Sequence, residues 1–284
     1  KAVNWAVDGE QGVADPRGIS ARKLAVDCHT LTADDMAVKT LANCLAEADM
    51  ELAGLVATPM ASGEACLVED ELQHGAACID IGGGTTSVSL FIRGEVVFAD
   101  VIRMGGEHIT LDIVRGLGLD EAEAERLKVM DGSAVAIDGG LHRGLMDRRE
   151  ARRRGYAAIP TLSDLISIIR PRFEETMEMA WDRLEQAGFG HLAGRRVVLT
   201  GGGALLGGSV ETAQRIFDRQ ARIGRPLRLA GLPPTQSGPE FSAVAGLASA
   251  VLHPTDDVWK GAKAPKPQGG NRVGRLVQWL RETW

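Results

Sequence analysis

The chain lacks several features that would mark whole classes of protein. Its four cysteines form no Cys-x-x-Cys motif and are widely spaced, at Cys28, Cys44, Cys66 and Cys78. This spacing argues against a disulfide framework or a zinc site and favours reduced thiols in the cytosol. No apolar run approaches the ~18 residues needed to cross a membrane, and no secretory signal opens the chain. A net charge of −6 argues against wholesale nucleic-acid binding.

An initial methionine is also missing. The chain begins at Lys1, and residues 1–7 already have the pattern of the middle of a strand, so we expect a piece that lacks its natural N-terminus. With 284 residues, 44% of them hydrophobic, the chain is long enough to bury a sizeable core. We expect two subdomains rather than one.

The most informative feature present is a pair of glycine triplets. The first lies in Asp80-Ile81-Gly82-Gly83-Gly84-Thr85-Thr86-Ser87, and the second, Gly201-Gly202-Gly203, follows Val197-Val198-Leu199-Thr200. Each triplet follows an apolar run that predicts a buried strand, so each is predicted to be a strand-to-loop turn. Glycine allows positive φ and brings backbone N–H groups close to an anion. The pair predicts one nucleotide held between two halves of the protein.

The remaining pattern predicts an α/β fold. An antiparallel meander is expected at 76–81, 87–92 and 96–102, with further strands at 1–7, 24–28, 52–57, 133–137 and 197–200. Helices are expected at 34–49, 59–72, 106–116, 120–129, 161–187, 209–222 and 240–252. Asp34 or Asp35 is predicted to cap the first helix, and Pro171 to kink or break the long one. The first helix is expected to bury Met36, Leu41, Cys44 and Leu45.

Six arginines gather in residues 142–154, against Asp147 and Glu150. The segment is interpreted as a solvated loop or strand edge, with a docking site for an acidic partner as the alternative.

The C-terminal segment 271–284 has an amphipathic pattern. At about 100° per residue, its apolar residues fall on one helical face and Arg272 and Arg281 flank them. The residues predicted to contact a membrane are Val273, Leu276, Val277, Trp279, Leu280, Arg281 and Trp284. Residues 254–270 have the composition of a flexible linker. We expect an interfacial helix on an anionic membrane surface, and the alternative is a terminal helix folded back on the body.

Three motifs resemble those of the actin, hexokinase and heat-shock-chaperone ATPase superfamily. Ile79 to Thr85 resembles its second phosphate motif, and Leu199 to Ala204 resembles its adenosine motif. Between them, Ala124-Glu125-Arg126-Leu127-Lys128 is similar to the adenine-side helix of the bacterial actins. Three motifs in this order are far more specific than any one glycine motif alone.

Within that superfamily the chain resembles the FtsA family of bacterial cell-division proteins along nearly its whole length. The resemblance rests on residues 32–70, on Met104 to Ile113, on Arg222 to Leu227 and on Trp279-Leu280-Arg281 in the tail.

The resemblance implies an actin-like, ribonuclease-H-like ATPase fold with a mixed sheet and flanking helices. It implies complete subdomains 2A and 2B and partial subdomains 1A and 1C. The implied boundaries are 1–32 for the remnant of 1C, 33–75 for the rear of 1A, 76–114 with 191–253 for 2A, and 115–190 for 2B. Residues 254–270 are then the linker and 271–284 the membrane-targeting helix.

The resemblance also implies a site for ATP and Mg²⁺. Backbone N–H groups from Gly82 to Thr85, with the hydroxyls of Thr85 and Thr86, would hold the β- and γ-phosphates. Asp80 would meet Mg²⁺ through a water molecule; its alternative role is that of a buried turn carboxylate. The residues implied around the adenosine and α-phosphate are Glu125, Lys128, Gly201, Gly202 and Gly203. For Glu125 and Lys128 the alternative is an exposed helix face.

Two departures from the superfamily pattern limit the implied activity. The first phosphate loop, an Asp-x-Gly turn, is not found in this chain, so the two glycine turns are expected to form an incomplete clamp. Thr58 stands where heat-shock chaperones have a water-activating glutamate. A threonine cannot act as a general base at neutral pH, so weak ATPase activity at most is expected.

The implied role is that of a peripheral protein at the cytoplasmic face of the inner membrane. It would polymerise, bind the C-terminal peptide of FtsZ, tether the FtsZ ring and recruit other divisome proteins. Arg170 and Arg172 are the candidate contacts for that peptide, with a solvated helix face as the alternative. A pilus-assembly ATPase, or a kinase or phosphatase on the same fold, remains an alternative function.

Overall fold

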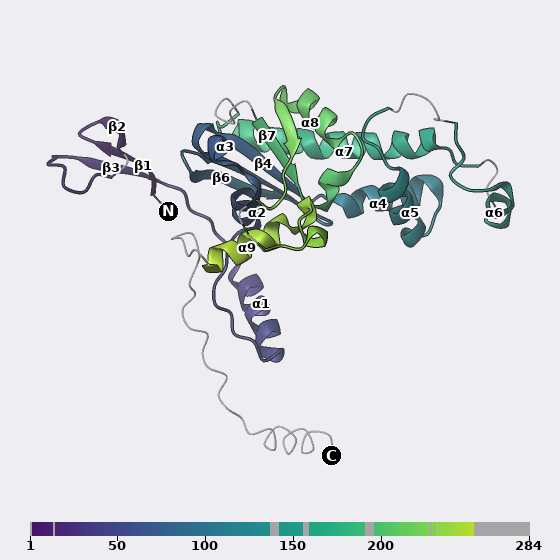
Figure 1. Ribbon diagram of the computed structural model, residues 1–284, viewed down its shortest axis with the longest axis horizontal. Coiled ribbons are helices and arrows are strands. Elements are labelled where there is room, and N and C mark those ends of the chain that lie inside the picture. Colours follow the sequence, from purple (N-terminus) through teal and green to yellow (C-terminus); the bar gives the residue numbers. More distant parts are fainter. Residues whose placement is uncertain are drawn as a thin grey trace, which may run out of the picture. The chain divides into compact units, whose positions relative to one another are not determined.

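The computed structural model describes residues 2–13, 15–136, 142–155, 159–190, 196–227, 229 and 231–252 (Figure 1). These residues divide into two units. The larger contains residues up to 30 and from 57 onward, and the smaller contains residues 31–56. Each unit is described by itself below.

The larger unit is built on a five-stranded mixed sheet with the order β6-β5-β4-β7-β8. Its strands are β4 (Ala76–Ile81), β5 (Thr86–Ile92), β6 (Glu95–Ile102), β7 (Arg196–Thr200) and β8 (Gln220–Ile223). β4, β5 and β6 form the predicted antiparallel meander. β7 pairs in parallel with β4, and β8 in parallel with β7. A parallel neighbour needs a crossover connection, and the chain between β6 and β7 supplies it with helices.

β4 lies at the centre of this sheet and is buried along its whole length. Successive side chains on a strand point to opposite faces. Ile79 and Ile81 belong to the main apolar core, whereas Cys78 and Asp80 contact helix α2 (Thr58–Cys66). Because both faces are covered, the strand has an almost continuous apolar sequence.

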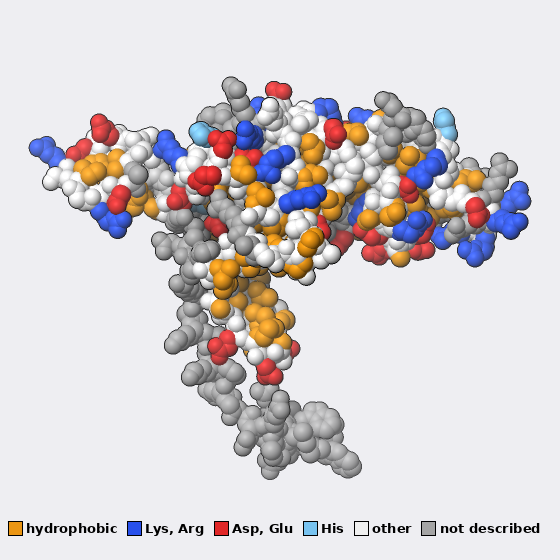
Figure 2. All heavy atoms as spheres, in the orientation of Figure 1, with side chains coloured by type: hydrophobic (Ala, Val, Ile, Leu, Met, Phe, Trp, Pro, Cys, Tyr) orange, Lys and Arg blue, Asp and Glu red, His pale blue; other side chains and the backbone are white. Residues whose placement is uncertain are grey.

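Helices α4 (Gly106–Leu117), α7 (Leu162–Gln186) and α8 (Ser209–Phe217) share the main core with the sheet. α5 (Glu121–Asp131) packs against α4 and α7. α6 (Arg148–Arg153) lies at the end of this part of the molecule, where Lys and Arg side chains gather (Figures 1 and 2).

On the opposite face, α2 packs closely against α9 (Ser242–Leu252). Glycine makes this packing possible, because a Cβ at Gly246 would overlap the backbone of Ala61. A Cβ at Gly63 would likewise overlap the ring of Phe91 on β5. The described residues also contain three short 3₁₀ turns: η1 (Gly202–Leu205), η2 (Pro234–Gln236) and η3 (Pro239–Phe241).

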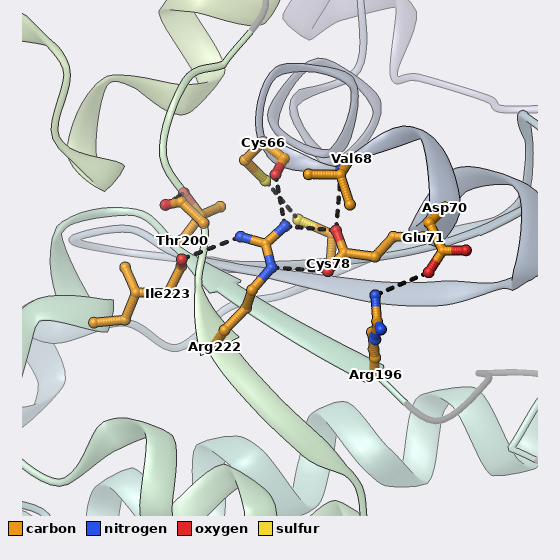
Figure 3. Close-up of polar contacts among 10 residues, drawn as sticks. Cys66, Val68, Asp70, Glu71, Cys78, Arg196, Thr200, Arg222 and Ile223 are labelled. Carbon is orange, nitrogen blue, oxygen red and sulfur yellow. Dashed lines mark hydrogen bonds and ion pairs between the residues drawn. The ribbon is translucent and has the colours of Figure 1, made fainter.

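An ion pair joins the sheet to helix α3 (Glu69–His74) (Figure 3). Arg222 of β8 donates from Nε to Glu71 Oε1 over 2.7 Å and from Nη2 to Glu71 Oε2 over 2.5 Å. Its Nη2 also donates to the carbonyl of Cys66 over 3.0 Å. The thiols of Cys66 and Cys78 lie 3.6 Å apart beside this pair, and both are buried. The hydrogen bond between the Cys78 and Cys66 thiols and the burial of Cys78 raise the pKa of the Cys78 thiol.

A separate three-stranded antiparallel sheet has the order β2-β1-β3. Its strands are β1 (Ala2–Val7), β2 (Glu10–Val13) and β3 (Leu24–Cys28). The turn between β1 and β2 places Asp8 and Gly9 at positive φ. The strands predicted at 1–7 and 24–28 are confirmed, and β2 was not predicted.

The smaller unit contains α1 (Asp35–Glu47), and Asp34 caps it by accepting from the N–H of Ala37 over 3.0 Å. The predicted capping is therefore confirmed. The predicted buried side is wrong, because no residue of α1 is buried and Met36 is 69% exposed. Leu41 and Cys44 are exposed as well, and Leu45 is half-buried. Within the described residues of this unit, 31–56, α1 has only extended flanks beside it, so no second apolar face covers these side chains there.

Two predictions near α2 are wrong. Residues 52–57 form no strand; only Leu55 makes a single bridge. The helix predicted at 59–72 is two helices, α2 and α3, because Leu67 and Val68 are extended. The N–H of Val68 donates to Glu71 Oε2 over 3.0 Å, so the carboxylate that pairs with Arg222 also starts the second helix.

Three later elements also differ from the prediction. Ser133 makes only an isolated bridge to Gly207, because its hydroxyl donates to the carbonyl of Val135 and turns the backbone. The helix predicted at 209–222 ends at Phe217, since Asp218 is left-handed and β8 then pairs with β7. Of the two outcomes predicted for Pro171, the break does not occur, because α7 continues through this residue; the kink stays a prediction.

The arginine-rich segment 142–154 contains α6 rather than a loop. Arg143 pairs with Asp131, and Arg154 lies 3.7 Å from Asp120, so both connect the segment to the neighbourhood of α5. A docking role for the other arginines stays a prediction, as do the subdomain boundaries. The linker at 254–270 and the helix at 271–284 lie outside the described residues.

Candidate functional site

The two glycine turns lie side by side at one edge of the sheet. β4 and β7 are parallel neighbours with Asp80 opposite Thr200, so their carboxyl ends meet at the same edge and each turn begins there. The ranges that contain the turns, 76–114 and 191–253, were assigned to one subdomain, and the placement of a nucleotide between two halves stays a prediction. Both come from one sheet, and they lie at the edge where open α/β sheets bind ligands.

The first turn, Gly82–Thr85, is closed by a hydrogen bond from the N–H of Gly82 to the carbonyl of Thr85 over 2.9 Å. Helix α4 begins directly against this turn. The N–H groups of Gly106 and Glu107 donate to the carbonyls of Gly82 and Gly83, each over 2.9 Å. A Cβ at Gly105 would lie 2.6 Å from the Gly82 carbonyl oxygen, so only glycine allows this approach.

This contact fixes the direction of the remaining N–H groups in the turn. In a trans peptide the carbonyl of one residue and the N–H of the next point in opposite directions, and the described residues contain no cis peptide. The carbonyls of Gly82 and Gly83 point to α4, so the N–H groups of Gly83 and Gly84 point away from it. Within the described residues nothing accepts from either N–H. Successive N–H groups in such a turn can bind an anion.

The two threonines of this turn differ. Thr85 is exposed, which is compatible with its predicted contact to a phosphate. Thr86 is fully buried, and its hydroxyl donates to the carbonyl of Met104 over 2.8 Å. This hydrogen bond weighs against the prediction that the Thr86 hydroxyl contacts a ligand.

The second turn contacts the end of β4 closely. Gly201 has a φ of +81°, and a Cβ there would overlap the Asp80 carboxylate and the Ile81 carbonyl. A Cβ at Gly203 would overlap the side chain of Ile81. The N–H of Gly201 donates to the carbonyl of Pro239 over 3.1 Å. Gly202 and Gly203 open η1, where the first N–H groups have no partner inside the helix.

Asp80 lies where α2 and the two turns meet. Its side chain accepts a short hydrogen bond from the hydroxyl of Ser62 on α2, and 9% of the residue is exposed. Burial raises the pKa of Asp80, and the Ser62 hydrogen bond partly offsets that rise. A desolvated carboxylate is stabilised by a nearby cation.

Glu125 and Lys128 extend the site along α5. Lys128 Nζ donates to Glu125 Oε2 over 2.6 Å, to Thr110 Oγ1 over 2.8 Å and to the Gly106 carbonyl over 3.0 Å. Burial pushes the pKa of Glu125 up, but the hydrogen bonds from Lys128 and Thr110 outweigh it and the pKa is lowered. Lys128 is only 13% exposed, so the exposed-helix alternative does not describe it.

Three residues of the site escaped the sequence prediction: Ser62, Glu107 and Thr110. A Cβ at Gly83 would lie 2.8 Å from Glu107 Oε1, so this carboxylate borders the first turn. Its place directly after Gly105-Gly106 was a signal that could have identified it. Ser62 lies among small residues of α2 and carries no such signal.

Arg170 and Arg172 have different surroundings on α7. Arg170 Nε donates to Glu174 over 2.7 Å and lines a pocket of about 410 Å³ with Ser163, Ser167 and Pro171. Arg172 Nε donates to Asp112 of α4 over 2.5 Å and Nη1 donates to Glu175 over 2.6 Å. The hydrogen bond with Asp112 raises the pKa of Arg172. Arg170 therefore lines a surface cavity, whereas Arg172 is held by two carboxylates on α4 and α7.

The predicted membrane contacts lie outside the described residues: Val273, Leu276, Val277, Trp279, Leu280, Arg281 and Trp284. Within the described part of the chain, no helix has both the length and the apolar content to cross a bilayer. That part also contains no cluster of three or more His, Cys, Asp or Glu side chains able to hold a metal ion.

Comparisons with known proteins agree with these features. The family model for the cell division protein FtsA matches residues 77–246. The cell division protein FtsA of Agrobacterium fabrum is 41% identical over 99% of this chain and 65% of its own length, and that of Escherichia coli K12 is 28% identical over 98% and 68%. The chain thus spans just under two thirds of the first of these relatives.

Among solved structures, MreB5 of Spiroplasma citri bound to ADP superposes with a TM-score of 0.59 and 21% identity. The match covers 77% of this chain and 65% of that one. This likeness shows the predicted actin-like ATPase fold.

Proposed function

Because this chain belongs to the FtsA family of cell division proteins, we propose that it acts as a nucleotide-binding, actin-like membrane tether for the FtsZ ring. In this proposal it binds ATP with Mg²⁺, self-associates into filaments and recruits later divisome proteins. It does so on the cytoplasmic face of the inner membrane. One observation carries the nucleotide part: two glycine turns lie side by side, one with outward N–H groups, next to a buried carboxylate.

The residues of the site support this ligand. The N–H groups of Gly83 and Gly84 would donate hydrogen bonds to phosphate oxygens, as successive backbone N–H groups in anion-binding turns do. Glu125 and Lys128 would border the adenosine, and Gly202 and Gly203 would allow the ribose and α-phosphate to approach. The MreB5 structure that shares this fold contains ADP, which favours a nucleotide over other anions.

The carboxylates at the first turn fit Mg²⁺ as a partner of the nucleotide. Mg²⁺ keeps several waters and takes only one or two protein carboxylates beside substrate phosphates, so a cluster of three ligands is not required. Asp80 and Glu107 approach the turn from different elements. They would repel a bare triphosphate, and a bound cation would remove that repulsion. Thr58 at the start of α2 supplies no base, so we propose binding with slow hydrolysis at most.

Replacing Asp80 by alanine tests the nucleotide site. We expect Asp80→Ala in the full-length protein to bind ATP·Mg²⁺ about 10- to 100-fold more weakly, the usual effect of losing a group that supports a bound metal. Isothermal titration with a non-hydrolysable ATP analogue measures it. Unchanged affinity would refute the assignment of Asp80.

The matched control for this test is Asp70→Ala. Asp70 is an exposed carboxylate of α3 that pairs with Arg196, so its removal makes the same change in charge away from the turns. Its nucleotide affinity should equal that of the wild type.

A tether must make two contacts, one with the membrane (the membrane end) and one with FtsZ (the FtsZ end). The amphipathic pattern of 271–284 supports the membrane end, and the pocket at Arg170 supports the FtsZ end. Glu174 of that pocket pairs both with Arg170 and with Arg215, which lies outside the pocket lining. Together these three side chains carry one net positive charge for an acidic peptide. Arg172 is held by Asp112 and Glu175, so we propose Arg170 and not Arg172 as the contact.

A vesicle co-sedimentation assay tests both ends at once. Full-length protein is mixed with anionic vesicles and a fluorescent FtsZ C-terminal peptide. We expect deletion of 271–284 to leave both protein and peptide in the supernatant. We expect Arg170→Glu to sediment with the vesicles but to leave the peptide behind, because the charge of the pocket is reversed.

The contrast within this assay is Arg172→Glu. It should lower the melting temperature, since it places a third carboxylate beside Asp112 and Glu175, and the folded fraction should keep the peptide. Equal sedimentation with and without 271–284 would contradict the membrane end. Peptide retained in full by Arg170→Glu would contradict the FtsZ end.

A further inference from the structure

The Asp80 carboxylate contacts the Ser62 hydroxyl on one side and the backbone at Gly201 on the other. On one side, the Ser62 hydroxyl donates to Asp80 Oδ2. On the other, Oδ1 lies against Gly201, where a Cβ would overlap it. One oxygen therefore has a fixed donor, and the other lies between the end of β4 and the second glycine turn. A carboxylate has about four lone-pair positions, so these contacts leave it able to accept more.

Ser62 itself is held rigidly. It is 0% exposed and lies in α2, which packs against α9 through Gly246 and against β5 through Gly63. A helix packed this closely cannot shift without opening both contacts. The Ser62 hydroxyl is therefore in place before any ligand arrives, and it fixes the orientation of the Asp80 side chain in advance.

We propose that Ser62 is a positioning residue of the nucleotide site, which orients Asp80 toward Mg²⁺ and makes binding of the nucleotide depend on the metal. The inference rests on the proposed nucleotide site. Ser62 does not itself reach the ligand in this proposal; it acts through Asp80, as residues hydrogen-bonded to metal-supporting groups do.

A second consequence follows from the place of Ser62 on α2. Thr58 lies four residues earlier, so both face the same side of the helix. The Ser62–Asp80 hydrogen bond is thus a direct polar link between the middle of α2 and the end of β4. In this proposal the bond also fixes the position of Thr58 relative to the first glycine turn. Thr58 stands where heat-shock chaperones have their water-activating glutamate.

The test is a double-mutant cycle in the full-length protein. Affinity for a non-hydrolysable ATP analogue is measured for wild type, Ser62→Ala, Asp80→Ala and the double variant, each with Mg²⁺ and with EDTA. We expect Ser62→Ala to weaken binding about tenfold with Mg²⁺ and to leave binding in EDTA unchanged. In the Asp80→Ala background, Ser62→Ala should have no further effect on affinity.

Two checks separate positioning from a general structural role. Ser62→Thr keeps the hydroxyl and should restore most of the metal dependence. A far-ultraviolet circular dichroism melt without ligand should show that every variant is folded at the titration temperature. If Ser62→Ala is unfolded there, Ser62→Cys, which keeps a weaker donor of similar size, takes its place and should show an intermediate loss.

The outcomes distinguish a failure of the proposed Mg²⁺ site from a failure of the positioning role of Ser62 alone. Wild-type protein that binds the analogue equally with Mg²⁺ and EDTA would overturn the Mg²⁺ site and this inference with it. If wild type depends on the metal, equal losses from Ser62→Ala in Mg²⁺ and in EDTA would overturn the inference alone. Independent, additive effects of Ser62→Ala and Asp80→Ala would do the same.

Discussion

Protein carrying Gly201→Ala is expected to lose nucleotide binding and about 3 kcal/mol of its free energy of unfolding. The second glycine turn requires a φ of +81° at this residue, which an alanine adopts only at a cost of about 1–2 kcal/mol. The new methyl group would also overlap the Asp80 carboxylate and the Ile81 carbonyl, and overpacking of this kind costs about 1–3 kcal/mol. Relief of that overlap must displace Asp80 or the turn.

Chemical denaturation and titration with the ATP analogue measure the two effects separately. The control is Gly118→Ala, because Gly118 ends α4 with a φ of +63° and has open space where a Cβ would be. That variant carries the backbone strain without the overlap. It should lose about 1 kcal/mol and bind nucleotide normally. Normal binding by Gly201→Ala would contradict the contact between the two turns.

Arg222→Met is expected to destabilise the larger unit by about 3 kcal/mol, the low end of the range for a broken buried pair. The Glu71 side chain is only 1% exposed, so it would remain buried without its cation. The guanidinium also holds the Cys66 carbonyl at the end of α2 (Figure 3). The expected loss of stability is at the low end of that range because the Arg222 side chain is 37% exposed. Water can therefore reach the space that the guanidinium leaves beside Glu71.

The neighbouring pair offers an internal comparison on the same helix. Arg196 and Asp70 are 46% and 61% exposed, and an exposed pair contributes about 0–1 kcal/mol. Arg196→Met should therefore change the denaturation midpoint little. Equal losses from Arg196→Met and Arg222→Met would show that burial of Glu71 does not set the strength of the pair.

The sequence predicted the parts of the molecule that depend on local pattern. The meander, the strand before each glycine turn and the cap at Asp34 were all visible in short stretches of residues. The adjacency of β4 and β7 was not visible in this way, because no local signal states which strand pairs with which. Only the resemblance to the FtsA family, which puts 76–114 and 191–253 in one subdomain, indicated that the two turns belong together.

The errors have a common physical origin in contacts that are distant in sequence. The break between α2 and α3 depends on Glu71 and its pairing with Arg222. The early end of α8 depends on β8 joining the edge of β7. In the site, Ser62 was missed because a serine among alanines and glycines reveals its role only when Asp80 is beside it.

The parallel pairing of β4 with β7 also has a consequence for how the protein folds during synthesis. Between the two strands the chain forms helices α4, α5, α6 and α7. Ribosomes add about 5–20 residues per second. β4 and its glycine turn therefore emerge on the order of ten seconds before β7 can cover them. During that interval one edge of β4 is unpaired, and an unpaired edge is open to association with other chains. The nascent protein should depend on chaperones most strongly in this window.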